Sequence, residues 1–143
     1  MNSPARAGPT RVDWAALSAP SVGEFAALAE AAFAALPKEV RELTGDVVFR
    51  VQEFAEPQVL ADLGIEDPFD LAGLYQGVSR MDRSSFAPAP MASMVFLYRR
   101  PILDEWVELG DVSLGELVAH VLIHEIGHHF GLSDAQIEAI QAD

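Results

Sequence analysis

The feature that most constrains this chain is a cluster of histidines on what the sequence marks as a single helix. All four histidines fall within residues 120–129. Ser113 and Glu116 form a capping-box pattern, which predicts that a helix starts there, and apolar residues continue from that point to Phe130. Gly131 follows, where a glycine in the left-handed conformation commonly ends a helix. We therefore predict one buried helix that carries all the histidines.

Within this helix, residues 124–128 read His-Glu-Ile-Gly-His, which is the HExxH pattern. Histidines four residues apart project from one face of an α-helix, so two imidazoles can meet one metal ion. Glu125 lies roughly 100° around the helix from His124. That position suits a general base acting on a metal-held water better than it suits a ligand. The pattern predicts His124 and His128 as metal ligands and Glu125 as the catalytic base.

A catalytic zinc site needs a third protein ligand and one open position. Asp134 lies six residues beyond the second motif histidine, and on a continuous helix it would be about 9 Å further along the axis. Gly131 removes this obstacle because it lets the chain turn back sharply. Ser133 and Gln136 repeat the capping pattern, which places the aspartate in the first turn of a last helix. We expect Asp134 to be the third ligand, and Glu138, one turn later, is the alternative third ligand.

Simpler roles exist for each of these residues. The motif histidines could be ordinary surface or core histidines, Glu125 a charge on the helix surface, and Asp134 a helix-start residue without metal. His120 lies one turn before His124, and we expect it to be structural. His129 could hydrogen-bond to Glu125, act near the cleft or stabilise the helix end. A structural role is the expectation for His129 as well.

Composition limits the class of protein, the metal and the partners. Half of the 143 residues are apolar, enough for one domain with a core. The chain has no cysteine, so a metal needs nitrogen and oxygen ligands, for which we expect Zn²⁺. A formal charge of −13 argues against nucleic acid and anionic membranes as partners. The negative charge either keeps the protein soluble or attracts basic peptides. Neither a secretory signal nor an apolar stretch of roughly 20 residues is found, so we expect a cytoplasmic protein.

Periodicity elsewhere predicts a small sheet beside helices, which is an α+β fold. Residues 1–12 are typical of a flexible tail, and residues 13–143 are expected to form the domain. A capping box at Ser21 begins a helix that Pro37 ends. Further elements follow along the chain: strands at 47–53, 71–78 and 94–99, a short helix at 57–63 and a loop at 79–91.

Three segments carry a resemblance to a known family. HEIGHHFGLSD at 124–134, LYQGV at 74–78 and FLYRRPI at 96–102 resemble the bacterial zincin-like metallopeptidases with a minimal zincin fold. The resemblance implies a small mixed sheet packed against an active-site helix and further helices. It also implies zinc ligands at His124, His128 and Asp134, a base at Glu125, and a peptide or protein substrate.

We hypothesise that zinc polarises a water and the scissile carbonyl, while Glu125 removes the proton of the water. An extended substrate could pair with an edge strand, at 71–78 or at 94–98. The oxyanion donor stays open among four residues: Tyr75, Tyr98, Arg99 and His129. The alternative is a non-catalytic zinc-binding regulatory or interaction module of the same fold, in which a fourth protein ligand would close the site.

Overall fold

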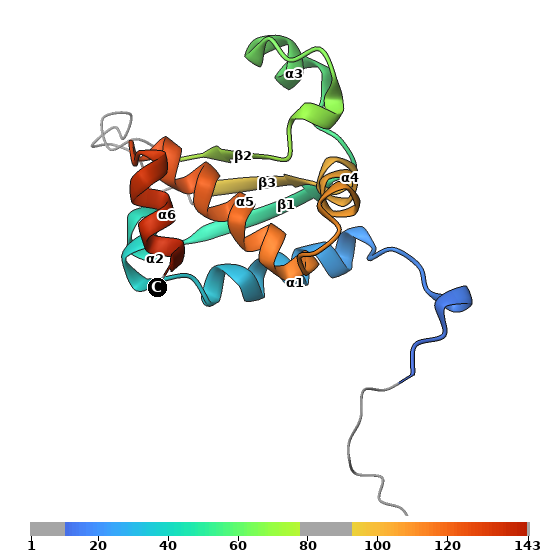
Figure 1. Cartoon of the computed structure of the whole chain (residues 1–143). Helices are drawn as coiled ribbons and strands as arrows, with labels where there is room; N and C mark the ends of the chain where they lie inside the picture. The colour runs from blue at the N-terminus through green and yellow to red at the C-terminus, as the bar shows by residue number, and fades with distance from the viewer. Residues whose placement is uncertain (1–10, 78–92, 143) are drawn as a thin grey trace, which may run out of the picture.

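The computed structural model describes residues 11–77 and 93–142. Over these residues the chain forms a three-stranded mixed sheet and six α-helices (Figure 1). This is the small α+β arrangement that the sequence predicts. The predicted tail at 1–12 lies outside the described residues except for its last two positions, and the predicted loop at 79–91 lies outside them entirely.

The sheet consists of β1 (Val47–Gln52), β2 (Gly73–Gln76) and β3 (Ser93–Tyr98). Its order is β1-β3-β2, with β3 parallel to β1 and antiparallel to β2. All three predicted strands are found: β1 and β2 are shorter than predicted, and β3 begins and ends one residue earlier. The prediction that 94–98 could be an edge is wrong, because β3 pairs with a neighbour on each side. β1 and β2 are the edge strands, so β2 is the one of the two predicted strands that could pair with an added peptide.

Most helices cover one face of the sheet, where the core lies (Figure 1). They are α1 (Val22–Ala34), α2 (Lys38–Thr44) and α5 (Leu114–His129), with α6 (Asp134–Ala142) packed on α5. α3 (Pro57–Leu63) lies on the other side of the sheet, next to a second small apolar cluster around Tyr98. α4 (Arg99–Leu109) continues directly from β3. None of the described helices has the length and apolar character needed to cross a membrane.

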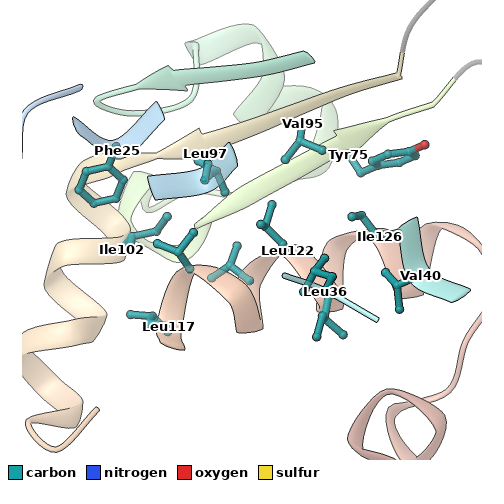
Figure 2. Close-up of a cluster of buried hydrophobic side chains, with 14 of the residues drawn as sticks. Phe25, Leu36, Val40, Tyr75, Val95, Leu97, Ile102, Leu117, Leu122 and Ile126 are labelled. Atoms are coloured by element: carbon teal, nitrogen blue, oxygen red, sulfur yellow. The ribbon is translucent and has the colours of Figure 1, made fainter. Parts of the chain in front are cut away.

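The main core joins α5 to the sheet. Leu122 and Ile126 of α5 are fully buried, as are Val95 and Leu97 of β3, and Figure 2 shows these side chains in one cluster. Phe25 of α1 belongs to the same cluster. Because α5 is held along its length by this packing, its remaining faces can carry polar side chains at fixed positions.

Two helices are absent from the sequence prediction, namely α2 and α4. In both cases a proline lies at the start of the helix. Pro37 is the N-cap residue of α2, and Pro101 is the third residue of α4. The first turn of a helix has no internal acceptor for its N–H groups, so proline costs little there. A short 3-10 helix also forms at each of two places, η1 (Trp14–Ala16) and η2 (Pro68–Asp70).

Candidate metal centre

The chain turns sharply between α5 and α6, as the glycine at 131 predicts. Gly131 has a φ of 81°. Its N–H donates to the carbonyl of His128 (3.1 Å), and the N–H of Leu132 donates to the carbonyl of Gly127 (2.8 Å). These two bonds form a Schellman motif, which satisfies the last carbonyls of the helix. The turn brings the first residue of α6, Asp134, back beside the last turn of α5.

A capping box fixes the start of α6. The N–H of Gln136 donates to Oγ of Ser133 (3.1 Å), and the N–H of Ser133 donates to Oε1 of Gln136 (2.7 Å). The sequence predicts both bonds. They hold Asp134 at the first position of the helix, where the helix dipole also favours a carboxylate.

Gly127 allows α6 to pack closely against α5. A Cβ atom at this position would lie 2.8 Å from Cδ1 and 2.9 Å from Cγ1 of Ile137, which is fully buried. Only glycine therefore fits beneath Ile137. Sequence reasoning treated Gly127 as a free position of the motif. The signal was present nonetheless, since a glycine inside a helix costs stability and is usually retained for a packing reason.

The structure brings two of the three predicted ligands together. Nε2 of His128 lies 2.9 Å from Oδ1 of Asp134. The side chains of His128 and Asp134 are 53% and 79% exposed, so the pair is open to solvent. The ring of His124 is one turn back, with its centroid 5.5 Å from that of His128. Among residues 11–77 and 93–142, no three His, Cys, Asp or Glu side chains are grouped as a ready metal site.

His124 has properties that suit a ligand. Its Nδ1 atom is buried and has no hydrogen-bond partner among the described residues. Burial is the largest cause that lowers the pKa of His124, followed by the neighbouring imidazoles of His120 and His128. The Asp134 carboxylate acts on this pKa in the opposite direction. A lowered pKa keeps the imidazole neutral, and a neutral imidazole is the form that binds metal. Two imidazoles and a carboxylate form a donor set suited to zinc.

Glu125 lies between α5 and the edge strand. A Cβ atom added at Gly73 of β2 would come 3.5 Å from Cγ of Glu125 and 3.0 Å from Cγ1 of Val121. Gly73 thus leaves room for the glutamate beside the strand, a role that the sequence alone does not reveal. Burial raises the pKa of Glu125, and His128 opposes this rise. A carboxylate with a raised pKa is a stronger base near neutral pH.

The two other histidines make packing contacts. The His120 ring lies 4.0 Å from that of His124, and its Nδ1 is 3.2 Å from Nε2 of Gln141. The His129 ring packs edge-on against Tyr75 at 4.5 Å. These contacts support the structural roles expected for both residues.

The four candidate oxyanion donors differ in their surroundings. The Tyr75 hydroxyl is 2.8 Å from Oγ of Ser93 in the protein interior. Arg99 donates from Nε to the carbonyl of Pro20 (2.6 Å) and pairs with a glutamate. Burial raises the pKa of Tyr98, and the charges of two glutamates, one of them Glu125, add to this rise. Tyr98 therefore keeps its proton, whereas Tyr75 and Arg99 are occupied elsewhere.

Comparison with known protein families gives a match over most of the chain. Residues 44–143 match the family model described as zincin-like metallopeptidase. No curated protein matches the chain in sequence. The matched span includes the whole sheet and the α5–α6 unit, and therefore every residue predicted for the site.

Proposed function

Because the chain belongs to the zincin-like metallopeptidase family, we propose that it hydrolyses peptide bonds with a zinc ion held by His124, His128 and Asp134. The observation that carries this proposal is the 2.9 Å separation between Nε2 of His128 and Oδ1 of Asp134. Two ligand atoms on one tetrahedral zinc ion lie about 3.3 Å apart. A nitrogen and an oxygen from different helices thus already stand at nearly the separation that a shared ion requires.

His124 completes the proposed ligand set. It lies one helical turn from His128, and its lowered pKa leaves one ring nitrogen unprotonated and able to bind a metal. When bound, zinc would supply a Lewis acid that activates water and polarises the scissile carbonyl. Glu138, the alternative third ligand, lies one turn beyond Asp134 on α6, whereas Asp134 already contacts His128. This contact favours Asp134 as the third ligand.

Glu125 is proposed as the general base. Its partly buried carboxylate accepts a proton from the attacking water and returns it to the nitrogen of the leaving amine. The raised pKa of Glu125 supports both transfers, because the group must take up and release a proton near neutral pH. Its side chain lies beside Gly73 of β2.

The substrate is proposed to be an extended peptide paired with the free edge of β2. Among the described residues, β2 pairs only with β3, so its other edge can accept backbone hydrogen bonds from a peptide. Gly73 in this strand adjoins Glu125. A peptide on this edge would therefore pass beside the proposed base.

The exposed ligand pair favours catalysis over the alternative of a non-catalytic zinc module. Structural zinc sites are closed by four protein ligands, whereas catalytic sites keep one position open. His128 and Asp134 are both more than half exposed. This accessibility is what a substrate-binding site needs.

Elemental analysis tests the metal part of the proposal. Protein purified without added metal should carry one zinc per chain, and His128→Ala should lose it. His129→Ala is the matched control, since it removes the adjacent imidazole outside the proposed set and should retain zinc. Equal zinc content in all three proteins would refute the ligand assignment.

Cleavage of a peptide library, followed by mass spectrometry, tests the catalytic part. Glu125→Gln should retain zinc but lose turnover by a factor of at least about 100. Unchanged cleavage by Glu125→Gln would remove this residue from the mechanism. A zinc-loaded protein that cleaves no peptide would instead favour the non-catalytic module.

A further inference from the structure

Residues 11–20, here termed the leading segment, expose large apolar side chains. Val12, Trp14 and Leu17 are 47%, 74% and 61% exposed. The 3-10 helix within this segment has no buried residue. Because this tryptophan and this leucine are exposed, the chain does not gain the free energy that burial of their apolar surface would give. Arg11 places a cation directly before this apolar group.

A cavity of about 660 Å³ lies on the helical side of the molecule, between α1, α4, α5 and α6. This volume lies within the range of sites that bind small molecules or side chains. Its walls are largely apolar: Leu36, Leu109, Val112, Leu117, Ile123 and Ile140. Two carboxylates, Glu105 and Glu116, also line it, and no lysine or arginine does so among the described residues. The cavity therefore suits an apolar group with a neighbouring positive charge.

The leading segment matches this requirement, yet it extends away from the cavity of its own chain. It precedes the N-terminal end of α1 and points away from the other helices (Figure 1). The cavity adjoins Ala35 and Leu36, just beyond the opposite end of that helix. α1 has 13 residues and is about 20 Å long. The hydrogen bond from Arg99 to the carbonyl of Pro20 also fixes the point at which the segment leaves the body. To reach its own cavity, the segment would have to reverse direction within a few residues.

We propose that the leading segment of one copy occupies the cavity of a second copy. Trp14 and Leu17 enter the apolar part, and Arg11 approaches Glu105 and Glu116. Reciprocal exchange of two such segments gives a dimer with two-fold symmetry, in which each copy uses the same two surfaces. This inference does not depend on the proposed peptidase activity.

Disulfide trapping tests this arrangement, since the chain has no natural cysteine. Ala16→Cys lies in the exposed leading segment, and Leu109→Cys lies at the cavity. Val107→Cys is the control, because Val107 is 75% exposed on the same helix as Leu109 but does not line the cavity. Mixing separately purified single variants permits only bonds between copies. We expect the Ala16–Leu109 dimer to form about tenfold faster than the Ala16–Val107 dimer. Equal rates, or no bond, would overturn the proposal.

A double variant distinguishes the same chain from a second copy. With Ala16→Cys and Leu109→Cys in one chain, the proposal expects covalent dimers on a non-reducing gel. A disulfide closed within single chains at low protein concentration would assign the segment to its own cavity and overturn exchange.

Sedimentation velocity across a concentration series measures the association itself. Trp14→Ala should weaken the dimer about tenfold or more, because buried tryptophans commonly dominate interfaces. Glu105→Lys should weaken it as well, and Arg11→Glu combined with Glu105→Lys should recover part of the loss. All three positions are exposed in the single chain, so the fold should not change. A wild-type chain that stays monomeric throughout, or a Trp14→Ala dimer of unchanged affinity, would refute the proposal.

Discussion

Replacing Gly127 by alanine tests how the site is built, without any need for metal or substrate. Alanine is favoured over glycine inside a helix by about 1 kcal/mol. Here the new Cβ would lie 2.8 Å from Cδ1 of Ile137 and 2.9 Å from its Cγ1. Ile137 is fully buried, and its β-branched side chain has few alternative rotamers. The isoleucine cannot turn aside easily, so α6 itself has to move.

The magnitude follows from two opposing effects. Overpacking a core by one methyl group commonly costs 1–3 kcal/mol, and two contacts below 3.0 Å place this case in the upper half of that range, at about 2–3 kcal/mol. The gain in helix propensity offsets about 1 kcal/mol. We expect the free energy of unfolding to fall by about 1–2 kcal/mol. Zinc affinity should fall too, because Asp134 moves with α6.

Urea unfolding of the metal-free protein measures the loss. Gly115→Ala is the matched control on α5, since its Cβ would make an ordinary 3.8 Å contact with Leu28, and it should be neutral or stabilising. Ile137→Val removes the closest atom, so the double variant with Gly127→Ala should lose less stability than the sum of the two single changes. If Gly127→Ala proves as stable as Gly115→Ala, the close packing of α6 on α5 is refuted.

Three further predictions concern the turn, the pH dependence and the metal. Gly131→Ala should lower the free energy of unfolding by about 1–2 kcal/mol, because a φ of 81° is strained for alanine, and it should also weaken zinc binding. Gly110→Ala is the control, since Gly110 follows α4 at a φ of 76°. It should lose similar stability in urea titrations yet keep its zinc affinity. Equal zinc affinity in both variants would contradict the role of the turn. Burial raises the pKa of Tyr98, so above a pH of about 10 the folded state retains a proton that the unfolded chain loses. The free energy of unfolding should therefore fall as the pH rises through that region. Urea titrations at alkaline pH should show a smaller fall for Tyr98→Phe than for the wild type. An identical pH profile in both proteins would refute this role of Tyr98. Zinc at about 100 times its dissociation constant should stabilise the wild type by about 2.7 kcal/mol in the same assay, and a similar gain in His128→Ala would exclude His128 as a ligand.

The candidate site is predictable largely because its geometry is local. The capping residues Ser113 and Ser133 and the left-handed Gly131 each act on backbone groups within a few positions, so their types and spacing are sufficient to place α5, the turn and α6. The contact between His128 and Asp134 follows from that turn. Reasoning from one helix and one glycine therefore predicts the contact between the two proposed ligands without knowledge of the sheet.

What the sequence does not reveal depends on contacts between distant segments. The fit of Gly127 under Ile137 and of Gly73 beside Glu125 appears only when elements are packed together. The central position of β3 follows from pairing with strands far apart in the chain. The starts of α2 and α4 were missed for another reason, since a proline suits both the end and the first turn of a helix.

The short turn that joins α5 to α6 has a consequence for how the two proposed capacities, metal binding and peptide cleavage, would arise. All three proposed ligands lie within residues 124–134, so they can converge through contacts of very low sequence separation. The strand that would hold a substrate comes from residues 73–76, about fifty positions earlier. The proposed ligands thus lie in one compact stretch, whereas the proposed turnover also needs a strand from a distant part of the chain. A change confined to the free edge of β2, which leaves the core under α5 intact, should therefore reduce the proposed cleavage more than the proposed metal uptake.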